Sequence, residues 1–194
     1  VNVSRPLFVV GPPRSGTTLM HRLLADDQHQ FTTFPLWELL LAPALCEKYL
    51  LGGIARVDQK LGGHFVKLLK CVERKFSKSL EGVHQTSLFL PEEDYLGLLS
   101  YGGCFLAVLV FPKAAWVWRL GNFSDGLSEA RQRALVQAYR GLLQRHLYYR
   151  GLGRQVLSKN PTFSSWLPRL LEAFPDARFI GLLRSPLEIV PSQL

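Results

Sequence analysis

The chain has 194 residues, 47% of them hydrophobic, and a formal net charge of +8. This size and composition are sufficient to bury a core, and they predict one α/β domain over 1–194. Three scattered cysteines exclude a disulfide framework, no Cys/His spacing matches a zinc site, and no apolar stretch approaches the ~20 residues of a membrane span. We therefore expect no metal and no membrane span in this chain.

The predicted elements alternate between strands and helices. In chain order they are a strand over 7–10, helices over 17–25, 37–51, 54–80 and 129–150, a strand over 155–158, a helix over 163–173 and a strand over 178–183. Turn signals alternate with aromatic residues over 81–128, and we interpret this segment as a helical or loop insertion that covers the active site. The alternation predicts a P-loop-type parallel sheet flanked by helices.

The strand over 7–10 leads into a helix through a turn bounded by two glycines. Gly11 and Gly16 have the spacing of the G-x-x-x-x-G-K-[ST] phosphate loop, although Thr17 stands where that motif has lysine. Thr18 takes the final hydroxyl position. Glycines let the backbone approach a ligand closely, and the N–H groups that begin the helix favour an oxyanion. The turn therefore predicts a cradle for phosphate or sulfate, while the missing lysine weakens an ATPase interpretation.

A second cationic position follows the last predicted strand. Arg184 comes directly after 178–183, and Pro186 suits the first turn of a helix that carries Ser192. Ligands of open parallel sheets bind at the carboxyl ends of the strands, so Arg184 and Ser192 can face the same crevice as the turn after Val10. The alternative is that Arg184 is a salt-bridging surface residue and Ser192 a helix hydroxyl.

Three segments resemble the sulfotransferases that use 3′-phosphoadenosine 5′-phosphosulfate (PAPS), particularly the branch of tyrosylprotein sulfotransferases and bacterial-type enzymes. They are PPRSGTT at 12–18, SKNP at 158–161 and FPDARFIGLLRSPLEIVPSQ at 174–193, and they occur in the order expected for that family. The resemblance implies an enzyme that transfers a sulfuryl group from PAPS to an acceptor hydroxyl or amine by in-line displacement. The product is adenosine 3′,5′-bisphosphate, and no metal is required.

The resemblance also implies roles for individual residues. The 5′-phosphosulfate of PAPS would bind the loop residues Pro13, Arg14, Ser15, Gly16, Thr17 and Thr18. Arg184 and Ser192 would bind the 3′-phosphate. Lys159 follows a predicted strand and would contact the sulfate or the bridging oxygen, and with Arg14 it would stabilise charge on the transferring group. The alternative for Lys159 is an ordinary surface lysine.

The sequence leaves open which residue accepts the proton of the acceptor. The tyrosylprotein branch carries a glutamate shortly after the first helix, and Glu38 is the best positional match if a gap is assumed. Glu38 could instead cap or brace the following helix. The rivals are His84, Glu92, Glu93 and Asp94; cytosolic members use a histidine base, and the acidic run also resembles a helix N-terminus. We expect His21, on the helix after the loop, to be structural.

The positive charge is concentrated over 56–78 and 128–154. Such an excess attracts an anionic cofactor or an acidic acceptor. In the second stretch an apolar stripe leaves most arginines on the opposite helix face, so much of this charge is solvated surface, and no nucleic-acid motif accompanies it. The expected partners are PAPS and a hydroxyl-bearing acceptor, without nucleic acid.

The chain lacks an initiator methionine and stops inside a predicted helix, so we expect a sulfotransferase domain that is incomplete at its C-terminus. Two other function classes stay open. A P-loop nucleotide kinase or phosphotransferase would need Mg²⁺ and the lysine that the loop lacks, and the third class is a non-catalytic nucleotide-binding domain. The sequence fixes neither the acceptor nor the oligomeric state, with a homodimer among the options. The compartment is open too: the cytoplasm, or the Golgi lumen if a membrane anchor was removed.

Overall fold

Residues 1–64, 66–68, 71, 87–150, 153–189 and 191 are described by the computed structural model. The chain divides into two compact units, of which the first comprises Val1–Thr33 with Glu93–Leu194 and the second Phe34–Glu92. In sequence, the second unit is thus inserted into the first. That these two units together form one domain over 1–194 stays a prediction.

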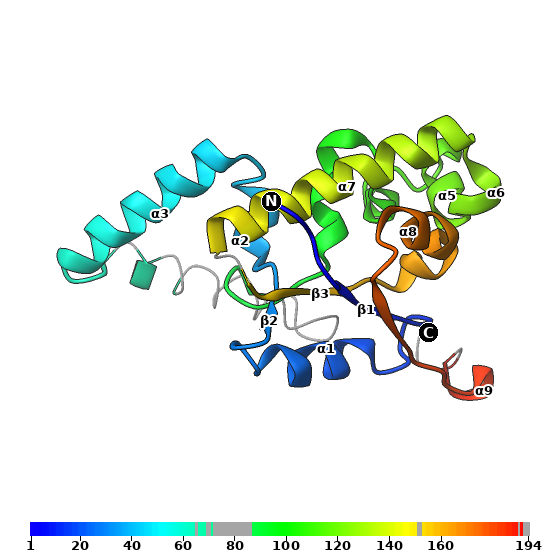
Figure 1. Cartoon of the computed structure of the whole chain (residues 1–194), viewed down its shortest axis with the longest axis horizontal. Coiled ribbons are helices and arrows are strands. Elements are labelled where there is room, and N and C mark those ends of the chain that lie inside the picture. Colours follow the sequence, from blue (N-terminus) through cyan, green and yellow to red (C-terminus); the bar gives the residue numbers. More distant parts are fainter. Residues whose placement is uncertain (65, 69–70, 72–86, 151–152, 190, 192–194) are drawn as a thin grey trace. The chain divides into compact units, whose positions relative to one another are not determined.

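The first unit is built on a parallel sheet, whose four strands within the described residues run in the order β2-β3-β1-β4 (Figure 1). The strands are β1 (Leu7–Val10), β2 (Phe31–Thr32), β3 (Gln155–Lys159) and β4 (Arg178–Gly181). The register pairs Val9 with Lys159 on one side and with Ile180 on the other. The carboxyl ends of β1, β3 and β4 therefore meet at one edge, and the predicted α/β parallel sheet is confirmed.

Both faces of β1 are covered, which is why all four of its residues are apolar and buried. Leu7 and Val9 pack with Leu157 and the partly buried Met20 and Leu24 of α1 (Thr17–Ala25). Phe8 points to the other face, where its ring meets those of Tyr139, Phe163, Phe174 and Phe179. The alternation of side chains along the strand thus fixes which helices cover each face.

The remaining helical elements of the first unit are mostly short. They are η1 (Asp94–Tyr101), η2 (Phe105–Leu109), α5 (Ala115–Gly121), α6 (Phe123–Gly126), α7 (Glu129–Arg150), η3 (Pro161–Trp166), α8 (Leu167–Ala173) and α9 (Pro186–Ile189). The helix predicted over 129–150 is confirmed as α7. Its buried stripe follows the helical period, comprising Leu135, Val136, Tyr139, Leu142, Leu143, His146 and Leu147.

The second unit contains α2 (Leu36–Leu40) and α3 (Leu45–Lys60). The single helix predicted over 37–51 is wrong: the chain leaves α2 at Leu41, and α3 begins after Ala44, whose N–H donates to Glu47 Oε2 at 2.9 Å. The break predicted at Gly52–Gly53 is also wrong, because both glycines lie inside α3. Glycine costs a helix only about 1 kcal/mol, which the neighbouring turns can bear.

The segment predicted as an insertion, 81–128, divides between the two units at Glu93. Its residues from Asp94 onwards form the short helices η1, η2, α5 and α6, as the turn signals indicate, whereas 81–86 lie outside the described residues. Its role as a cover for the site stays a prediction. None of the helices described here is long and apolar enough to span a bilayer.

Candidate functional site

The loop between β1 and α1 depends on backbone conformations that favour glycine. Gly11 has φ 151°, and a Cβ placed on it would lie 2.5 Å from the carbonyl oxygen of Leu182. Arg14 and Gly16 have φ values of 67° and 92°, in the left-handed region. Ser15 steadies the turn, since its hydroxyl donates to Pro12 O at 2.7 Å. A non-glycine residue held at positive φ is uncommon and points to a site whose geometry the fold enforces.

The loop delivers the start of α1 without a side-chain cap. Gly16 supplies no capping group, and the first turn carries no acidic side chain. A Cβ placed on Gly16 would meet no atom of the described residues within 4 Å, so the backbone here faces open space. Uncapped N–H groups and the positive end of the helix dipole attract an oxyanion. The geometry fits a phosphate or sulfate group, as the glycine spacing predicts.

Arg184 lies against this loop. Beyond β4 the ladder continues with a bond from Leu182 N to Val10 O at 2.9 Å. The Arg184 guanidinium then donates from Nη1 to the carbonyl oxygen of Arg14 at 3.1 Å and from Nε to Glu188 Oε2 at 2.8 Å. Two arginines distant in sequence are thus brought to one edge of the sheet. Ser192, the other residue expected near the 3′-phosphate, lies outside the described residues.

Lys159 ends β3 and reaches the first turn of α1. Its Nζ donates to Thr18 Oγ1 at 3.2 Å and to Glu93 Oε1 at 2.8 Å, and the residue is only 5% exposed. An ordinary surface lysine is therefore excluded. The cation that the loop lacks at Thr17 is supplied next to Thr18 from a different strand, and sequence reasoning did not foresee Glu93 as its partner.

A buried network lies behind this ion pair. Tyr139 Oη donates to Asp94 Oδ2 at 2.6 Å, Ser158 Oγ donates to Asp94 Oδ1 at 3.0 Å, and the two hydroxyls are 3.0 Å apart. Burial raises the pKa of Asp94 to about 7, although both hydrogen bonds act in the opposite direction. Burial also raises the pKa of Tyr139 well above its usual range. Asp94 has both carboxylate oxygens engaged and is 1% exposed, and its role as a base stays a prediction.

Sequence reasoning missed Tyr139 and Ser158 as members of this network. The signals that could have found them are modest: Ser158 directly precedes Lys159, and Tyr139 is an aromatic residue with a polar tip on the apolar stripe of α7. His21 lies in the same region and is 1% exposed. Its pKa is lowered to about 4, chiefly by burial and also by the charge of Lys159. His21 is therefore neutral at physiological pH, in keeping with the structural role expected for it.

Glu38 belongs to the second unit, in the first turn of α2. Its Oε1 accepts a hydrogen bond from Lys48 Nζ of α3 at 2.5 Å, and both side chains are fully buried. The ion pair joins α2 to α3, which agrees with the expectation that Glu38 braces the following helix. Its role as a base stays a prediction. Of the rivals, Glu92 donates its N–H to Phe34 O at 3.0 Å, and His84 lies outside the described residues.

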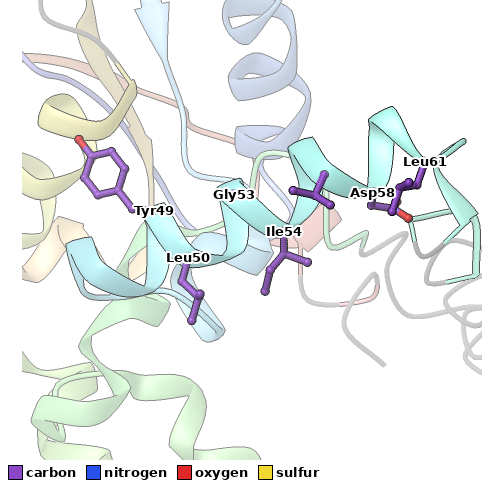
Figure 2. Close-up of a pocket in the computed structure, with 7 residues that line it drawn as sticks. Tyr49, Leu50, Gly53, Ile54, Asp58 and Leu61 are labelled. Atoms are coloured by element: carbon purple, nitrogen blue, oxygen red, sulfur yellow. The ribbon is translucent and has the colours of Figure 1, made fainter.

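The second unit also carries an apolar groove along α3, with a volume of about 510 Å³ (Figure 2). Its lining comprises Tyr49, Leu50, Gly53, Ile54, Val57, Asp58 and Leu61. None of these residues is among those that the sequence assigns to the donor or to catalysis. Within the part of the chain that the structure describes, no group of His, Cys, Asp and Glu side chains could hold a metal ion.

Comparison with known proteins gives consistent matches over most of the chain. Residues 6–81 match the profile of the sulfotransferase family. Two curated relatives, the omega-hydroxy-beta-dihydromenaquinone-9 sulfotransferases Stf3 of Mycobacterium bovis and Mycobacterium tuberculosis, are each 31% identical over 194 residues, which cover 97% of this chain and 44% of the relative. The chain thus spans less than half the length of these relatives.

Solved structures show the same fold. The chain matches sulfotransferase STF9 from Mycobacterium avium with a TM-score of 0.63 and 25% identity, over 100% of this chain and 46% of that one. It matches sulfotransferase STF1 from Mycobacterium tuberculosis with a TM-score of 0.57 and 20% identity, over 98% and 48% respectively. At these identities the agreement concerns chiefly the path of the backbone.

Proposed function

We propose that this chain, a member of the bacterial-type sulfotransferase family, transfers a sulfuryl group from PAPS to the hydroxyl or amine of an acceptor. One observation carries the proposal most directly: the Arg184 guanidinium donates to the carbonyl oxygen of Arg14. The loop between β1 and α1, over 11–16, is called the oxyanion loop below. The edge of the sheet that carries it therefore also carries Arg184 as a second cation. A donor that carries anionic groups at the 3′ and 5′ positions of one ribose requires two such anion sites close together.

The loop and its surroundings would hold PAPS in two places. The 5′-phosphosulfate would lie on the loop residues Pro13, Arg14, Ser15, Gly16, Thr17 and Thr18. The donors are the backbone N–H groups from Arg14 onwards and the hydroxyls of the serine and the threonines, whereas Pro13 has no N–H and contributes only to the shape of the turn. Arg184, together with Ser192, would hold the 3′-phosphate. The guanidinium of Arg184 is already oriented by Glu188 and by the loop itself.

The reaction would proceed by in-line displacement at sulfur. The acceptor oxygen forms a bond to sulfur, the bond from sulfur to the bridging phosphate oxygen breaks, and its electron pair leaves with adenosine 3′,5′-bisphosphate. Lys159 and Arg14 would stabilise negative charge on the transferring and leaving oxygens, because cations placed beforehand need no reorganisation during the reaction. Glu38 is our proposed base for the acceptor proton, and its rivals are His84, Glu92, Glu93 and Asp94.

Ligand-induced thermal shifts test the donor. We expect adenosine 3′,5′-bisphosphate to raise the melting temperature more than ATP with Mg²⁺ does, since only the former has a 3′-phosphate. A larger shift with ATP would refute the proposal in favour of a P-loop phosphotransferase. No shift with any donor or product would leave a domain that binds no nucleotide.

Arg184→Ala sharpens this test. A charge-assisted hydrogen bond to phosphate contributes about 1.5–3 kcal/mol, so we expect the affinity for adenosine 3′,5′-bisphosphate to fall about 10- to 100-fold. The affinity for adenosine 5′-phosphate should change less than about twofold. Arg178→Ala, at the opposite end of β4, is the matched control. Equal losses for both ligands would reject the 3′-phosphate role of Arg184.

The acceptor requires a separate experiment. The two mycobacterial relatives are named for a hydroxylated menaquinone, so a long-chain hydroxylated quinol belongs in the first screen. Labelled PAPS with that quinol, tyrosine peptides, glycans, sterols and simple phenols would identify the acceptor by transfer of label. Transfer to none of these classes, in a protein that binds the bisphosphate, would favour a non-catalytic nucleotide-binding role.

A further inference from the structure

Two consecutive acidic residues, Glu93 and Asp94, accept hydrogen bonds from the two consecutive residues that end β3. Glu93 accepts from Lys159 Nζ at 2.8 Å, while Asp94 accepts from Ser158 Oγ at 3.0 Å and from Tyr139 Oη at 2.6 Å. The pairs are 66 and 64 residues apart in sequence. The start of η1 is thereby fastened to the strand end that carries the candidate catalytic lysine.

The two contacts lie on opposite faces of the sheet. Successive side chains of a strand alternate between faces, so Ser158 points towards α7 and Tyr139, whereas Lys159 points towards α1 and Thr18. Asp94 is buried within its network, but the side chain of Glu93 is 20% exposed. The buried contact therefore anchors the backbone, and the neighbouring contact reaches the edge where the oxyanion loop begins α1.

Glu93 supplies the counter-charge of Lys159. Among the described residues it is the one acidic side chain within ion-pair distance of Lys159, whose own side chain is 6% exposed. An ammonium group so little exposed is costly without a counter-charge, and a flexible lysine stem needs a second contact to fix its head. Thr18 and Glu93 together supply that fixed position.

We infer that Glu93 is a positioning residue: its carboxylate holds the Lys159 ammonium against Thr18 for the transferring sulfuryl group. The inference rests on the proposed function. The same carboxylate has a second effect, since a negative charge beside Lys159 opposes the arrival of an anionic donor. Glu93 thus weakens binding of the sulfated donor while it raises the rate of transfer.

Glu93→Gln separates these two effects, because glutamine keeps the shape and removes the charge. We expect the dissociation constant for PAPS to fall severalfold and kcat to fall at least tenfold. Glu93→Asp keeps the charge, so PAPS affinity should remain that of the wild type and kcat should fall only a few-fold. Glu172→Gln, an exposed acid on α8, is the control for surface charge.

A double-variant cycle distinguishes positioning from proton abstraction. If Glu93 acts through the ammonium, Glu93→Gln should change kcat less than twofold in a Lys159→Met background. If Glu93 were the base instead, Glu93→Gln would lower kcat by the same factor in the wild-type and Lys159→Met backgrounds. That result would overturn the inference, as would a Glu93→Gln variant that keeps wild-type kcat.

The failure of the inference differs visibly from that of the proposed function. A wild-type protein that binds neither PAPS nor the bisphosphate would refute both. An active wild type whose Glu93→Gln variant binds PAPS no more tightly would refute the role of Glu93 alone. If Glu93→Gln does not fold, Glu93→Asp decides: PAPS affinity altered more than twofold would refute the inference.

Discussion

Asp94 and His21 should give the first unit two opposed dependences of stability on pH. Burial places the pKa of Asp94 at about 7, above its ordinary value of 3.8, and that of His21 at about 4, below its ordinary value of 6.5. Between pH 3.8 and 7 the folded chain keeps a proton on Asp94 that the unfolded chain has released, so the free energy of unfolding falls as pH rises. Between pH 4 and 6.5 the unfolded chain protonates His21 and the folded chain does not, so the free energy of unfolding rises with pH.

The two contributions are similar in size. At 1.36 kcal/mol per pH unit, the interval for Asp94 corresponds to about 4 kcal/mol and that for His21 to about 3 kcal/mol. The two nearly cancel from pH 4 to 6.5. Asp94→Asn keeps the side-chain volume and removes the titration, which should expose the contribution of His21 as a rise of about 3 kcal/mol over that range. His21→Gln should expose the opposite slope, a fall of about 4 kcal/mol by pH 7.

Urea unfolding at half-unit steps from pH 4 to pH 8 measures both slopes directly. The exposed Glu172→Gln serves as the control, with a profile parallel to that of the wild type. The groups facing Asp94 are Tyr139, Ser158 and Glu93, and those facing His21 are Lys159 and Arg22. If Asp94→Asn shifts the whole curve without changing its slope, then Asp94 does not hold a proton in the folded chain and the reasoning fails.

Two further substitutions test the loop and the proposed base. Gly11→Ala should abolish measurable binding of adenosine 3′,5′-bisphosphate and destabilise the chain by about 1–3 kcal/mol, because its Cβ would lie 2.5 Å from Leu182 O; unchanged affinity in a thermal-shift titration would contradict the cradle. Glu38→Gln should lower kcat at least tenfold with cofactor affinity nearly unchanged. Steady-state kinetics that show wild-type turnover would move the base to His84 or to the acidic run Glu92–Asp94.

The elements that the sequence predicted well are those whose pattern is local. β1 is a run of four apolar residues whose two faces are both covered, and the apolar stripe of α7 follows the helical period from Leu135 to Leu147. The break expected at Gly52–Gly53 fails because a glycine pair only weakens a helix, and capping and the following turns outweigh that cost. Local pattern therefore fixes which elements exist better than where they end.

The contacts in the candidate site, in contrast, join residues that are far apart in sequence. The motifs predicted that Arg14, Lys159 and Arg184 would emerge at strand ends, and the sheet register brings those ends together. No periodicity predicts that Glu93 meets Lys159, because the two residues are 66 positions apart in sequence and only the fold brings the start of η1 to the end of β3. The acidic run at Glu92–Asp94 was visible in the sequence, but its division between an ion pair and a buried network needed the fold.

The absence of a lysine from the loop has a structural consequence for how the donor would be gripped. In the usual phosphate loop the lysine and the N–H groups belong to one continuous segment. Here, besides Arg14 in the loop itself, Lys159 reaches the loop from the end of β3 and Arg184 from the segment after β4. Their placement therefore depends on the register in which Val9 lies opposite Lys159 and Ile180. A slip of one residue in β3 would turn Lys159 to the face of Tyr139 and leave Thr18 without its cation. The anion binding that we propose at this edge would thus depend on the folding of the whole sheet, in which the buried hydrogen bonds of Ser158 and Tyr139 to Asp94 join β3 to α7 and to the start of η1.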